Sequence, residues 1–171
     1  MILVDGFFHA DPHPGNVMLD TQTGVLTFLD LGLVGQLEQQ QRFDLMVHSF
    51  EQLEMLEGRA GTDVISAWIK VDTGMNRLGF RLEQFAVAYD RLRRVANVAP
   101  EPTLVTHLAN ADDRRDSKTA RQLSDFAAAT NGLAGARSIA NSAALLAWQE
   151  TRADWVRPGL ALYGASPFTD A

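Results

Sequence analysis

From residue 45 onward, short apolar runs typical of buried strands alternate with segments whose apolar residues recur at helical spacing. The runs are at 45–48, 64–71, 103–108, 138–140 and 160–162, and the helical segments are at 50–57, 82–98 and 117–130. Strands that alternate with helices lie parallel, because each helix returns the chain to the end of the sheet where the next strand begins. The pattern therefore predicts an α/β fold, and four or five such units are typical of part of a (β/α)₈ barrel.

The helical segments carry their own start and stop signals. Ser49 and Gln52 form the S-x-x-Q pattern of a capping box, which predicts a helix through about Glu57. Pro100 and Pro102 are expected to end the second helix. The apolar faces consist of Phe85, Ala88, Leu92 and Val95 in the second helix, and of Leu123, Phe126 and Ala127 in the third.

Polar side chains gather where the predicted strands end. They are Lys70, Asp72, His107, Asn141, Ser142 and Arg157. Carboxyl ends of parallel barrel strands meet at one face, so these side chains are expected to share a site. Plainer interpretations remain open: Asp72 could only form a turn, His107 could be a packed strand-end histidine, and Lys70 could be an exposed lysine.

Composition narrows the class of protein. The net charge is −6 and there is no long basic run, which argues against nucleic acid or an anionic membrane as the partner. The chain has no cysteine, which excludes disulfides and cysteine-based zinc or iron sites and fits a cytoplasmic protein. No apolar run approaches the roughly 20 residues of a transmembrane helix. The N-terminus MILVDGFFHA also lacks the basic start of a signal peptide. We therefore expect a cytoplasmic protein with a small-molecule ligand.

The first 46 residues carry a different pattern. A loop, HADPHPGN (9–16), precedes two strand-like runs that suggest a β-hairpin over residues 17–30. Asp11 and Asn16 have the D-x-x-x-x-N spacing of a kinase catalytic loop, and Asp30 begins DLG where kinases have DFG. In such enzymes one Asp orients the substrate hydroxyl, while the Asn and second Asp hold Mg²⁺ on ATP. This gives an alternative function, ATP and Mg²⁺ binding.

The stretches FFHADPHPGN and FLDLGLVG resemble the ABC1/UbiB/ADCK family of atypical kinases. The resemblance implies that Asp11 is the catalytic-loop aspartate and that Asn16 and Asp30 are Mg²⁺ ligands. Two other interpretations stay open: ordinary turn and strand-end residues, or a metal site made by His9, Asp11 and His13. A kinase also needs a Gly-rich loop and a strand lysine before this motif, so we expect the segment to be inactive.

Residues from about 47 onward resemble the alanine racemase family, whose members are fold-type-III barrel enzymes that use pyridoxal 5′-phosphate (PLP). The resemblance rests on VHSFEQLEMLE (47–57), WIKVDTGMNRLGF (68–80), THLANAD (106–112), SIANSAALL (138–146), WVRPGLALYG (155–164) and SPF (166–168). These motifs come in the family's order and cover about three quarters of the chain. The implied reaction is the interconversion of L- and D-alanine.

The resemblance also implies a role for each matched residue. Arg157 would face the pyridine nitrogen of PLP, with His107 hydrogen-bonded to Arg157. Arg77 would bind a substrate carboxylate or the phenolic oxygen, and a carbamylated Lys70 would orient Arg77. Tyr163 would continue the last barrel strand. The implied PLP-binding residues are Arg157, His107, Asn141, Ser142, Gly159 and Leu160, with the phosphate held by Ser142 and the backbone N–H groups of Gly159 and Leu160.

Two parts of the family's machinery are not found in this sequence. One is the PLP-carrying lysine of a K-A-N-A-Y-G-type motif, and the other is the catalytic tyrosine of a C-terminal β-domain. We therefore expect PLP to bind weakly and without a covalent bond, and alanine not to be racemised.

The two resemblances predict two parts, residues 1–46 and residues 47–171, joined near Gln40–Met46. Such a chimera is a natural fusion, an assembly artefact or a constructed sequence, and the sequence does not distinguish them. A third possibility is a non-catalytic globular domain. The open edges of a partial barrel are expected to favour self-association.

Overall fold

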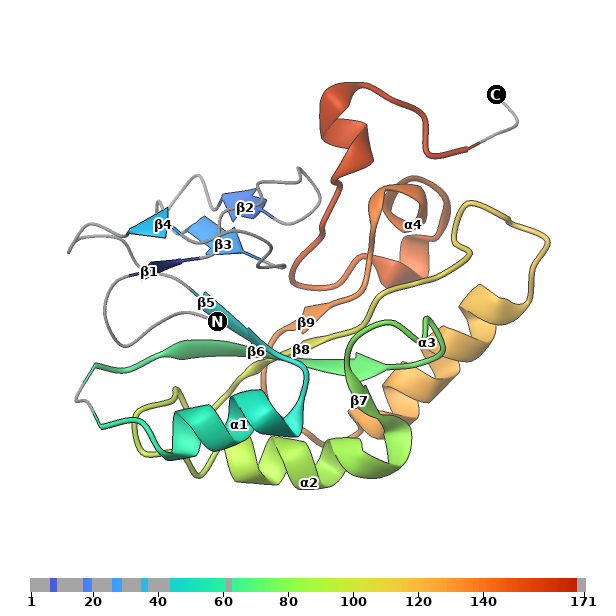
Figure 1. Ribbon diagram of the computed structural model, residues 1–171. Coiled ribbons are helices and arrows are strands. Elements are labelled where there is room, and N and C mark those ends of the chain that lie inside the picture. The colour runs from blue at the N-terminus through green and yellow to red at the C-terminus, as the bar shows by residue number, and fades with distance from the viewer. Residues whose placement is uncertain are drawn as a thin grey trace.

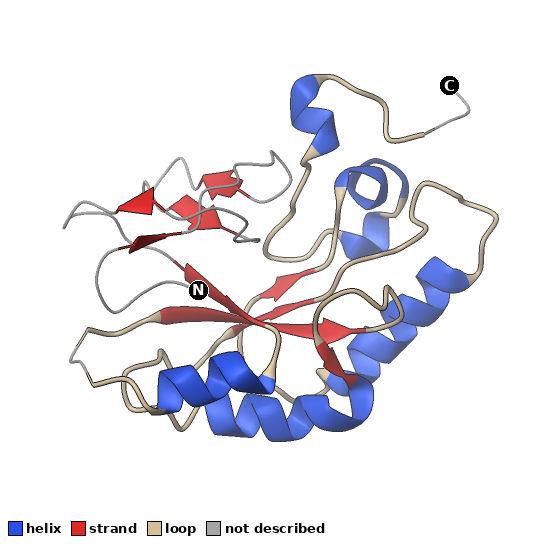
Figure 2. Cartoon of the chain, in the orientation of Figure 1, coloured by secondary structure: helices blue, strands red, loops and turns tan. Residues whose placement is uncertain are grey.

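The computed structural model describes residues 44–60 and 63–168, together with the backbone of four short strands before residue 44. The main body is a five-stranded sheet with helices α1, α2 and α3 on one face (Figures 1 and 2). Its strands are β5 (Asp44–Val47), β6 (Ser66–Asp72), β7 (Phe80–Arg81), β8 (Thr103–Val105) and β9 (Arg137–Ser138). The helices are α1 (Phe50–Glu57), α2 (Leu82–Leu92), α3 (Lys118–Ala129) and α4 (Ser142–Ala147), followed by the 3₁₀ helices η2 (Gln149–Thr151) and η3 (Leu160–Tyr163).

The strands run in the order β5-β6-β8-β9, and β7 pairs with the end of β6. Every pairing in this sheet is parallel. The register places Val47 beside Ile69, Lys70 beside Val105, and Val105 beside Ser138. The prediction of adjacent, parallel strands within 64–71, 103–108 and 137–140 is thus confirmed, as is the α/β class.

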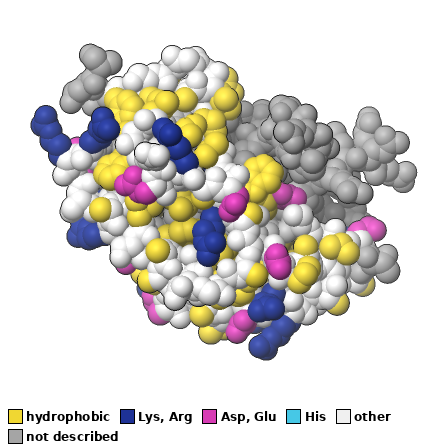
Figure 3. Space-filling view, turned by 180° about the vertical axis from the view of Figure 1, so that it is seen from behind, with side chains coloured by type: hydrophobic (Ala, Val, Ile, Leu, Met, Phe, Trp, Pro, Cys, Tyr) yellow, Lys and Arg dark blue, Asp and Glu magenta, His cyan; other side chains and the backbone are white. Residues whose placement is uncertain are grey.

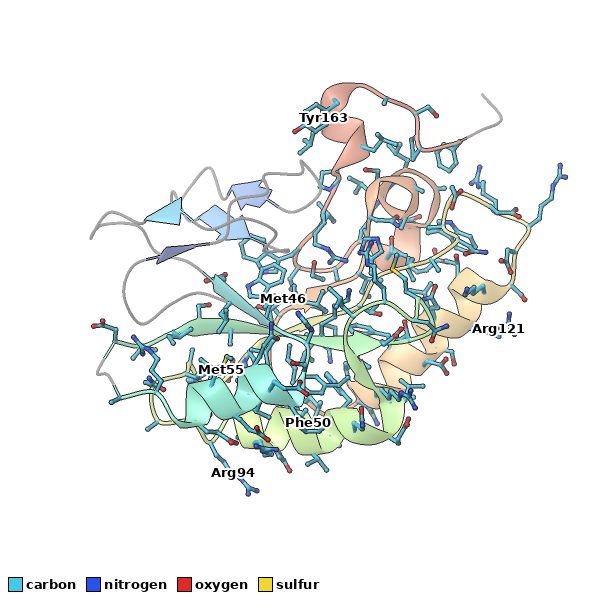
Figure 4. All side chains as sticks on the ribbon, in the orientation of Figure 1. Met46, Phe50, Met55, Arg94, Arg121 and Tyr163 are labelled. Carbon is cyan, nitrogen blue, oxygen red and sulfur yellow. The ribbon has the colours of Figure 1, made fainter. Side chains whose placement is uncertain are left out.

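The helix-covered face of the sheet carries the main hydrophobic core. Ile69 of β6 and Leu104 of β8 are completely buried in it, together with the predicted α2 residues Phe85, Ala88 and Leu92. The opposite face holds a smaller cluster of Met46, Trp68 and Val105, with Trp155 against it. Figure 4 shows Met46 on the side of the sheet away from α1 and α2. The two faces therefore differ: one packs against helices, and the other, called the barrel-interior face below, is the face that the predicted partial barrel would enclose.

The capping box predicted at the start of α1 is present in a modified form. The Ser49 hydroxyl accepts a hydrogen bond from the Gln52 backbone N–H at 3.4 Å, and Ser49 is the N-cap. The Gln52 side chain reaches back to the backbone N–H of His48, at 2.8 Å, and not to that of Ser49. The helix ends at Glu57, as predicted.

The second helix is shorter than predicted. It ends at Leu92, although its apolar spacing continues to Val95 and the nearest proline is Pro100. The chain leaves the helix because residues 93–98 turn back to the sheet, where Ile65 donates to the Asn97 carbonyl at 2.8 Å. In α3, Phe126 is buried as predicted, whereas Ala127 is exposed, so that part of the predicted face was wrong.

The prediction of a last strand at 160–162, continued by Tyr163, was wrong. Residues 160–163 form the 3₁₀ helix η3, which ends at Gly164 in the left-handed conformation. The extended segment beside β9 comes earlier: Trp155 bridges to Ser138, and the Arg157 N–H donates to the Ala140 carbonyl at 2.9 Å. Once this segment has taken the place beside β9, the apolar run that follows has no strand to pair with among the described residues.

Before residue 44, β1 (Phe7–Phe8) pairs antiparallel with β4 (Gly35–Gln36), and β2 (Val17–Leu19) pairs antiparallel with β3 (Leu26–Phe28). The second pair confirms the predicted hairpin. Asp11, Asn16 and Asp30, the predicted kinase-like residues, lie outside the described residues. Among the helices that the structure does describe, none has the length and apolar character needed to cross a bilayer.

Candidate functional site

The carboxyl ends of the strands place a second row of side chains on the barrel-interior face. Successive residues of a strand point to opposite faces, so a residue two positions beyond an interior residue faces the interior again. His48 follows Met46, Lys70 follows Trp68, and His107 follows Val105 in this way. The apolar cluster therefore forms the floor on which a polar site is built.

A cavity of about 320 Å³ lies at this end of the sheet. All eight residues predicted for the racemase-like site line it: Lys70, Arg77, His107, Asn141, Ser142, Arg157, Gly159 and Leu160. They come from the ends of β6, β8 and β9 and from the segment 157–160. Of the six polar residues predicted to share a site, Lys70, His107, Asn141, Ser142 and Arg157 line one cavity, whereas Asp72 does not.

Arg157 is a buried cation of the cavity, with 7% of its surface exposed. Its guanidinium donates to the Thr106 carbonyl at 2.6 Å, to the Ser138 hydroxyl, and more weakly to the Ile139 carbonyl at 3.4 Å. Burial lowers the pKa of Arg157 to about 10, which still leaves it charged at pH 7. These partners are all neutral oxygens, and no carboxylate pairs with Arg157 among the described residues. A buried cation that has only neutral partners among the described residues would interact favourably with a hydrogen-bond acceptor or an anionic group of a ligand.

His107 is neutral at physiological pH. Burial, and after it the nearby charges of Arg157, Lys70 and Arg77, together lower its pKa from 6.5 to about 3. The expected hydrogen bond from His107 to Arg157 is not among those that the described residues make, since the guanidinium is held by the carbonyl of the preceding residue, Thr106. A neutral imidazole beside three cations can accept or donate a hydrogen bond without adding charge.

Arg77 lies at the rim of the cavity, on the turn that follows β6. Asp72 builds this turn, because its Oδ1 accepts from the backbone N–H groups of Gly74, Met75 and Asn76 at 2.9, 2.9 and 3.1 Å. The plainer interpretation of Asp72 as a turn residue is thus correct. Lys70, in contrast, is 7% exposed and lines the cavity, so it is not the exposed lysine of the alternative interpretation.

The opposite wall is formed by the start of α4 and the chain after Arg157. Asn141 caps α4, with its Oδ1 accepting from Ala144 at 3.0 Å and its Nδ2 donating to the Leu108 carbonyl at 3.1 Å. The Ser142 hydroxyl accepts from the Ala161 N–H at 3.1 Å. The Gly159 N–H, expected to bind phosphate, donates to the Arg157 carbonyl at 2.9 Å. Of the expected phosphate donors, Gly159 is therefore already engaged.

The charges of the lining indicate what the cavity can hold. Three cationic side chains, Lys70, Arg77 and Arg157, face a single carboxylate, that of Asp112. This donor set suits a ligand with phosphate, phenolate or carboxylate groups. Within the part of the chain that the structure describes, no group of three His, Asp or Glu residues could hold a metal ion.

Comparison with known proteins identifies the family. A model of the alanine racemase N-terminal domain matches residues 17–167.

This chain belongs to the alanine racemase family. Alanine racemases resemble it closely: that of Shewanella loihica is 52% identical over 124 residues, which are 72% of this chain and 35% of that protein. That of Shewanella amazonensis is 38% identical over 167 residues, or 98% of this chain and 40% of that protein. The crystal structure of the biosynthetic alanine racemase from Pseudomonas aeruginosa matches with a TM-score of 0.72 and 37% identity, over 76% of this chain and 36% of that one.

The family implies a PLP cofactor, in agreement with the cationic cavity. The chain spans between a third and two fifths of the length of these racemases. The matched range begins at residue 17, inside the segment whose motifs resemble the ABC1/UbiB/ADCK kinases. The kinase-like interpretation of residues 1–46, with its ATP and Mg²⁺, gains no support from these matches, and the boundary at residue 46 stays a prediction.

Sequence reasoning missed two polar residues of the cavity, His48 and Asp112. The signal that could have located His48 is its place in the strand: it comes directly after the Val47–Ile69 pair, in register with Lys70. Its Nε2 lies 3.0 Å from the Gln52 side-chain nitrogen, which orients the ring. Asp112 comes from a turn after β8, where no periodicity could have located it.

Proposed function

We propose that this alanine racemase-family chain provides a PLP-binding half of a racemase site and that, as these 171 residues, it binds PLP without racemising alanine. One observation carries the proposal: the strand ends gather Lys70, Arg77 and Arg157 around one cavity that contains a single carboxylate. PLP brings an anionic phosphate and a phenolic oxygen, which this charge distribution favours. When bound, PLP supplies an electron sink that loosens the α-proton of an amino acid.

The residues of the chain divide the tasks of holding such a ligand. Ser142 and the N–H of Leu160 lie on one wall and would hold the phosphate, while Arg77 at the rim would bind a carboxylate. Arg157 is held in a fixed plane by its three oxygen partners, so its remaining guanidinium edge would face the pyridine nitrogen. A cation there keeps that nitrogen unprotonated, which restrains the electron sink.

We infer that PLP binding is non-covalent. Lys70 and Lys118 are the two lysines of the chain. Lys70 is packed into the cavity wall, where the proposed task is to orient Arg77, and Lys118 begins α3 and does not line the cavity.

A PLP titration followed by absorbance tests the proposal. We expect a dissociation constant near the millimolar level, about −4 kcal/mol, because only part of the family's site is present. Arg157→Ala should abolish binding, and Arg77→Ala, at the exposed rim, should weaken it without affecting folding. Arg121→Ala is the matched control, since Arg121 is an exposed arginine on α3, outside the cavity (Figure 4).

Several results would contradict the proposal. Unchanged PLP affinity in both Arg157→Ala and Arg77→Ala would place the ligand elsewhere. Borohydride reduction followed by mass spectrometry should give no stoichiometric adduct, so one on Lys70 or Lys118 would refute non-covalent binding. Conversion of L- to D-alanine by the purified chain would show that these residues are sufficient for catalysis.

The kinase-like alternative has its own test. We infer that Asp11, Asn16 and Asp30 do not bind nucleotide, because the alanine racemase domain model matches residues 17–167, a range that includes Asp30 and overlaps the kinase-like segment. Calorimetric titration with Mg·ATP should give no heat above the buffer blank for the original chain. Asp11→Ala and Asp30→Ala should give the same result. Measurable Mg·ATP binding that either substitution removes would establish the alternative function.

A further inference from the structure

Gln122 occupies an unusual place for a glutamine, since it lies on the sheet-facing side of α3 with 1% of its surface exposed. Its Oε1 accepts from the Ala109 N–H at 2.9 Å. Its Nε2 donates to the His107 carbonyl at 3.0 Å and to the Thr73 hydroxyl at 3.1 Å. Both amide hydrogens and the amide oxygen are thus in use, which is what makes such burial tolerable.

Thr73 and Thr106 connect Gln122 to Arg157. The Thr73 hydroxyl lies 2.7 Å from the Thr106 hydroxyl, and the Thr106 carbonyl accepts from Arg157 at 2.6 Å. The two neighbouring carbonyls therefore have different partners. That of Thr106 accepts from the Arg157 guanidinium, and that of His107 accepts from Gln122. The Gln122 carboxamide links the turn after β6 to the loop after β8, and that loop holds Arg157.

We propose that Gln122 is a positioning residue of the cavity, which fixes the loop 106–109 and through it the orientation of Arg157 and the His107 ring. Within the described part of the chain, the hydrogen-bond partners of Arg157 are neutral oxygens, so no ion pair from these residues holds its guanidinium in place if the Thr106 carbonyl moves. Gln122 itself does not line the cavity. Its effect on PLP rests on the proposed function, whereas its effect on Arg157 does not.

Gln122→Met tests the proposal and needs no ligand. Methionine is chosen because it fills a similar volume but cannot make the three hydrogen bonds. Nuclear magnetic resonance should show a shifted side-chain N–H signal for Arg157 and faster hydrogen exchange at the Ala109 amide. Gln149→Met is the matched control, since Gln149 is an exposed glutamine outside the cavity, and both signals should stay at their original values. An unshifted Arg157 signal in folded Gln122→Met protein would overturn the proposal.

Gln122→Glu adds a readout that loss of packing alone would not give. The carboxylate keeps an acceptor for Ala109 but has no hydrogen for Thr73 or the His107 carbonyl, and burial raises the pKa of such a group. On protonation it regains one hydrogen, which it can donate to the His107 carbonyl, the partner that only accepts. The ratio of variant to original PLP dissociation constants should therefore fall from about tenfold at pH 8 toward one at pH 6. Gln122→Met should show no such recovery.

The outcomes separate this inference from the proposed function. If the original protein binds no PLP, the proposed function fails, and the Arg157 and Ala109 signals alone decide the role of Gln122. If Gln122→Met does not fold, Thr73→Val interrupts the same path with an isosteric side chain and should shift the Arg157 signal. A Gln122→Glu penalty that does not change with pH would overturn the proposal.

Discussion

His107 illustrates how one residue can connect stability with pH. Its pKa falls to about 3 in the folded chain because it is buried beside Arg157, Lys70 and Arg77. Its pKa in the unfolded chain is near 6.5, so between these values the unfolded state binds the proton and the folded state does not. The stabilisation due to neutral His107 is therefore fully present above pH 6.5 and is lost progressively as pH falls toward 3.

We expect the free energy of unfolding to drop by about 2 kcal/mol between pH 7 and pH 5 through this residue, since each pKa unit corresponds to about 1.4 kcal/mol. Urea unfolding at a series of pH values measures the drop. His107→Asn, which cannot be protonated, should flatten the curve in this range. If the free energy of unfolding of His107→Asn falls between pH 7 and pH 5 as steeply as that of the original chain, another group causes the pH dependence.

Single residues also show how far the site could be predicted from sequence. The eight predicted residues meet because motifs after successive strands report on strand ends, which parallel pairing brings together. Gln122 was not found, because a glutamine inside a helix reads as a surface residue until its three hydrogen bonds are seen. The role of Gly159 also differs from expectation, since a backbone N–H can be taken by a local turn that no sequence pattern reports.

Among the elements, the strands were predicted better than their neighbours. Buried strands such as β6 leave a continuous apolar run, whereas the end of α2 is decided by a distant partner, the Ile65–Val98 bridge. The run at 160–162 predicts a strand but forms a 3₁₀ helix, because apolarity alone does not distinguish a strand from a short 3₁₀ helix. Whether such a run becomes a strand depends on whether a neighbouring strand is free to pair with it. That neighbour is distant in sequence, so the run itself does not report it.

The loop between α3 and β9 offers a prediction at the element scale. Gly135 has φ +120°, and a Cβ built there would lie 2.2 Å from the Pro102 carbonyl oxygen, on the chain leading into β8. Gly135→Ala should therefore push β8 and β9 apart and cost about 3 kcal/mol or more of stability. Gly132→Ala is the control: its φ is +72° and nothing lies within 4 Å, so only about 1 kcal/mol of backbone strain is expected.

Thermal unfolding of the two alanine variants checks this prediction. Gly135→Ala should lower the midpoint several degrees more than Gly132→Ala does. Equal shifts in the two variants would mean that backbone conformation, and not the close approach to Pro102, determines the cost.

At the scale of the whole molecule, large apolar side chains remain at the surface of the C-terminal part. Leu162 and Tyr163 are 69% and 65% exposed, and Leu146 and Leu160 are also at least half exposed. Tyr163 projects from η3 at a distance from the sheet (Figure 4), and Figure 3 shows hydrophobic side chains gathered over this end of the molecule. Surfaces of this kind favour association.

We expect self-association that increases with protein concentration, measured by sedimentation velocity. The double variant Leu162→Gln, Tyr163→Gln should shift the distribution toward monomer by removing this apolar surface. Val87→Gln, at an exposed position on α2, serves as the control. A monomer at all concentrations, or a variant that associates as strongly as the original chain, would contradict the expectation.

The two faces of the sheet have a consequence for how the sequence can change. Along β6, Ile69 and Val71 contact the helices while Trp68 and Lys70 face the other way. Tolerance to substitution should therefore alternate from one residue to the next, with one set constrained by folding and the other by ligand. A designer could rewrite the odd or the even positions separately, so the same scaffold can acquire a new binding specificity without being rebuilt.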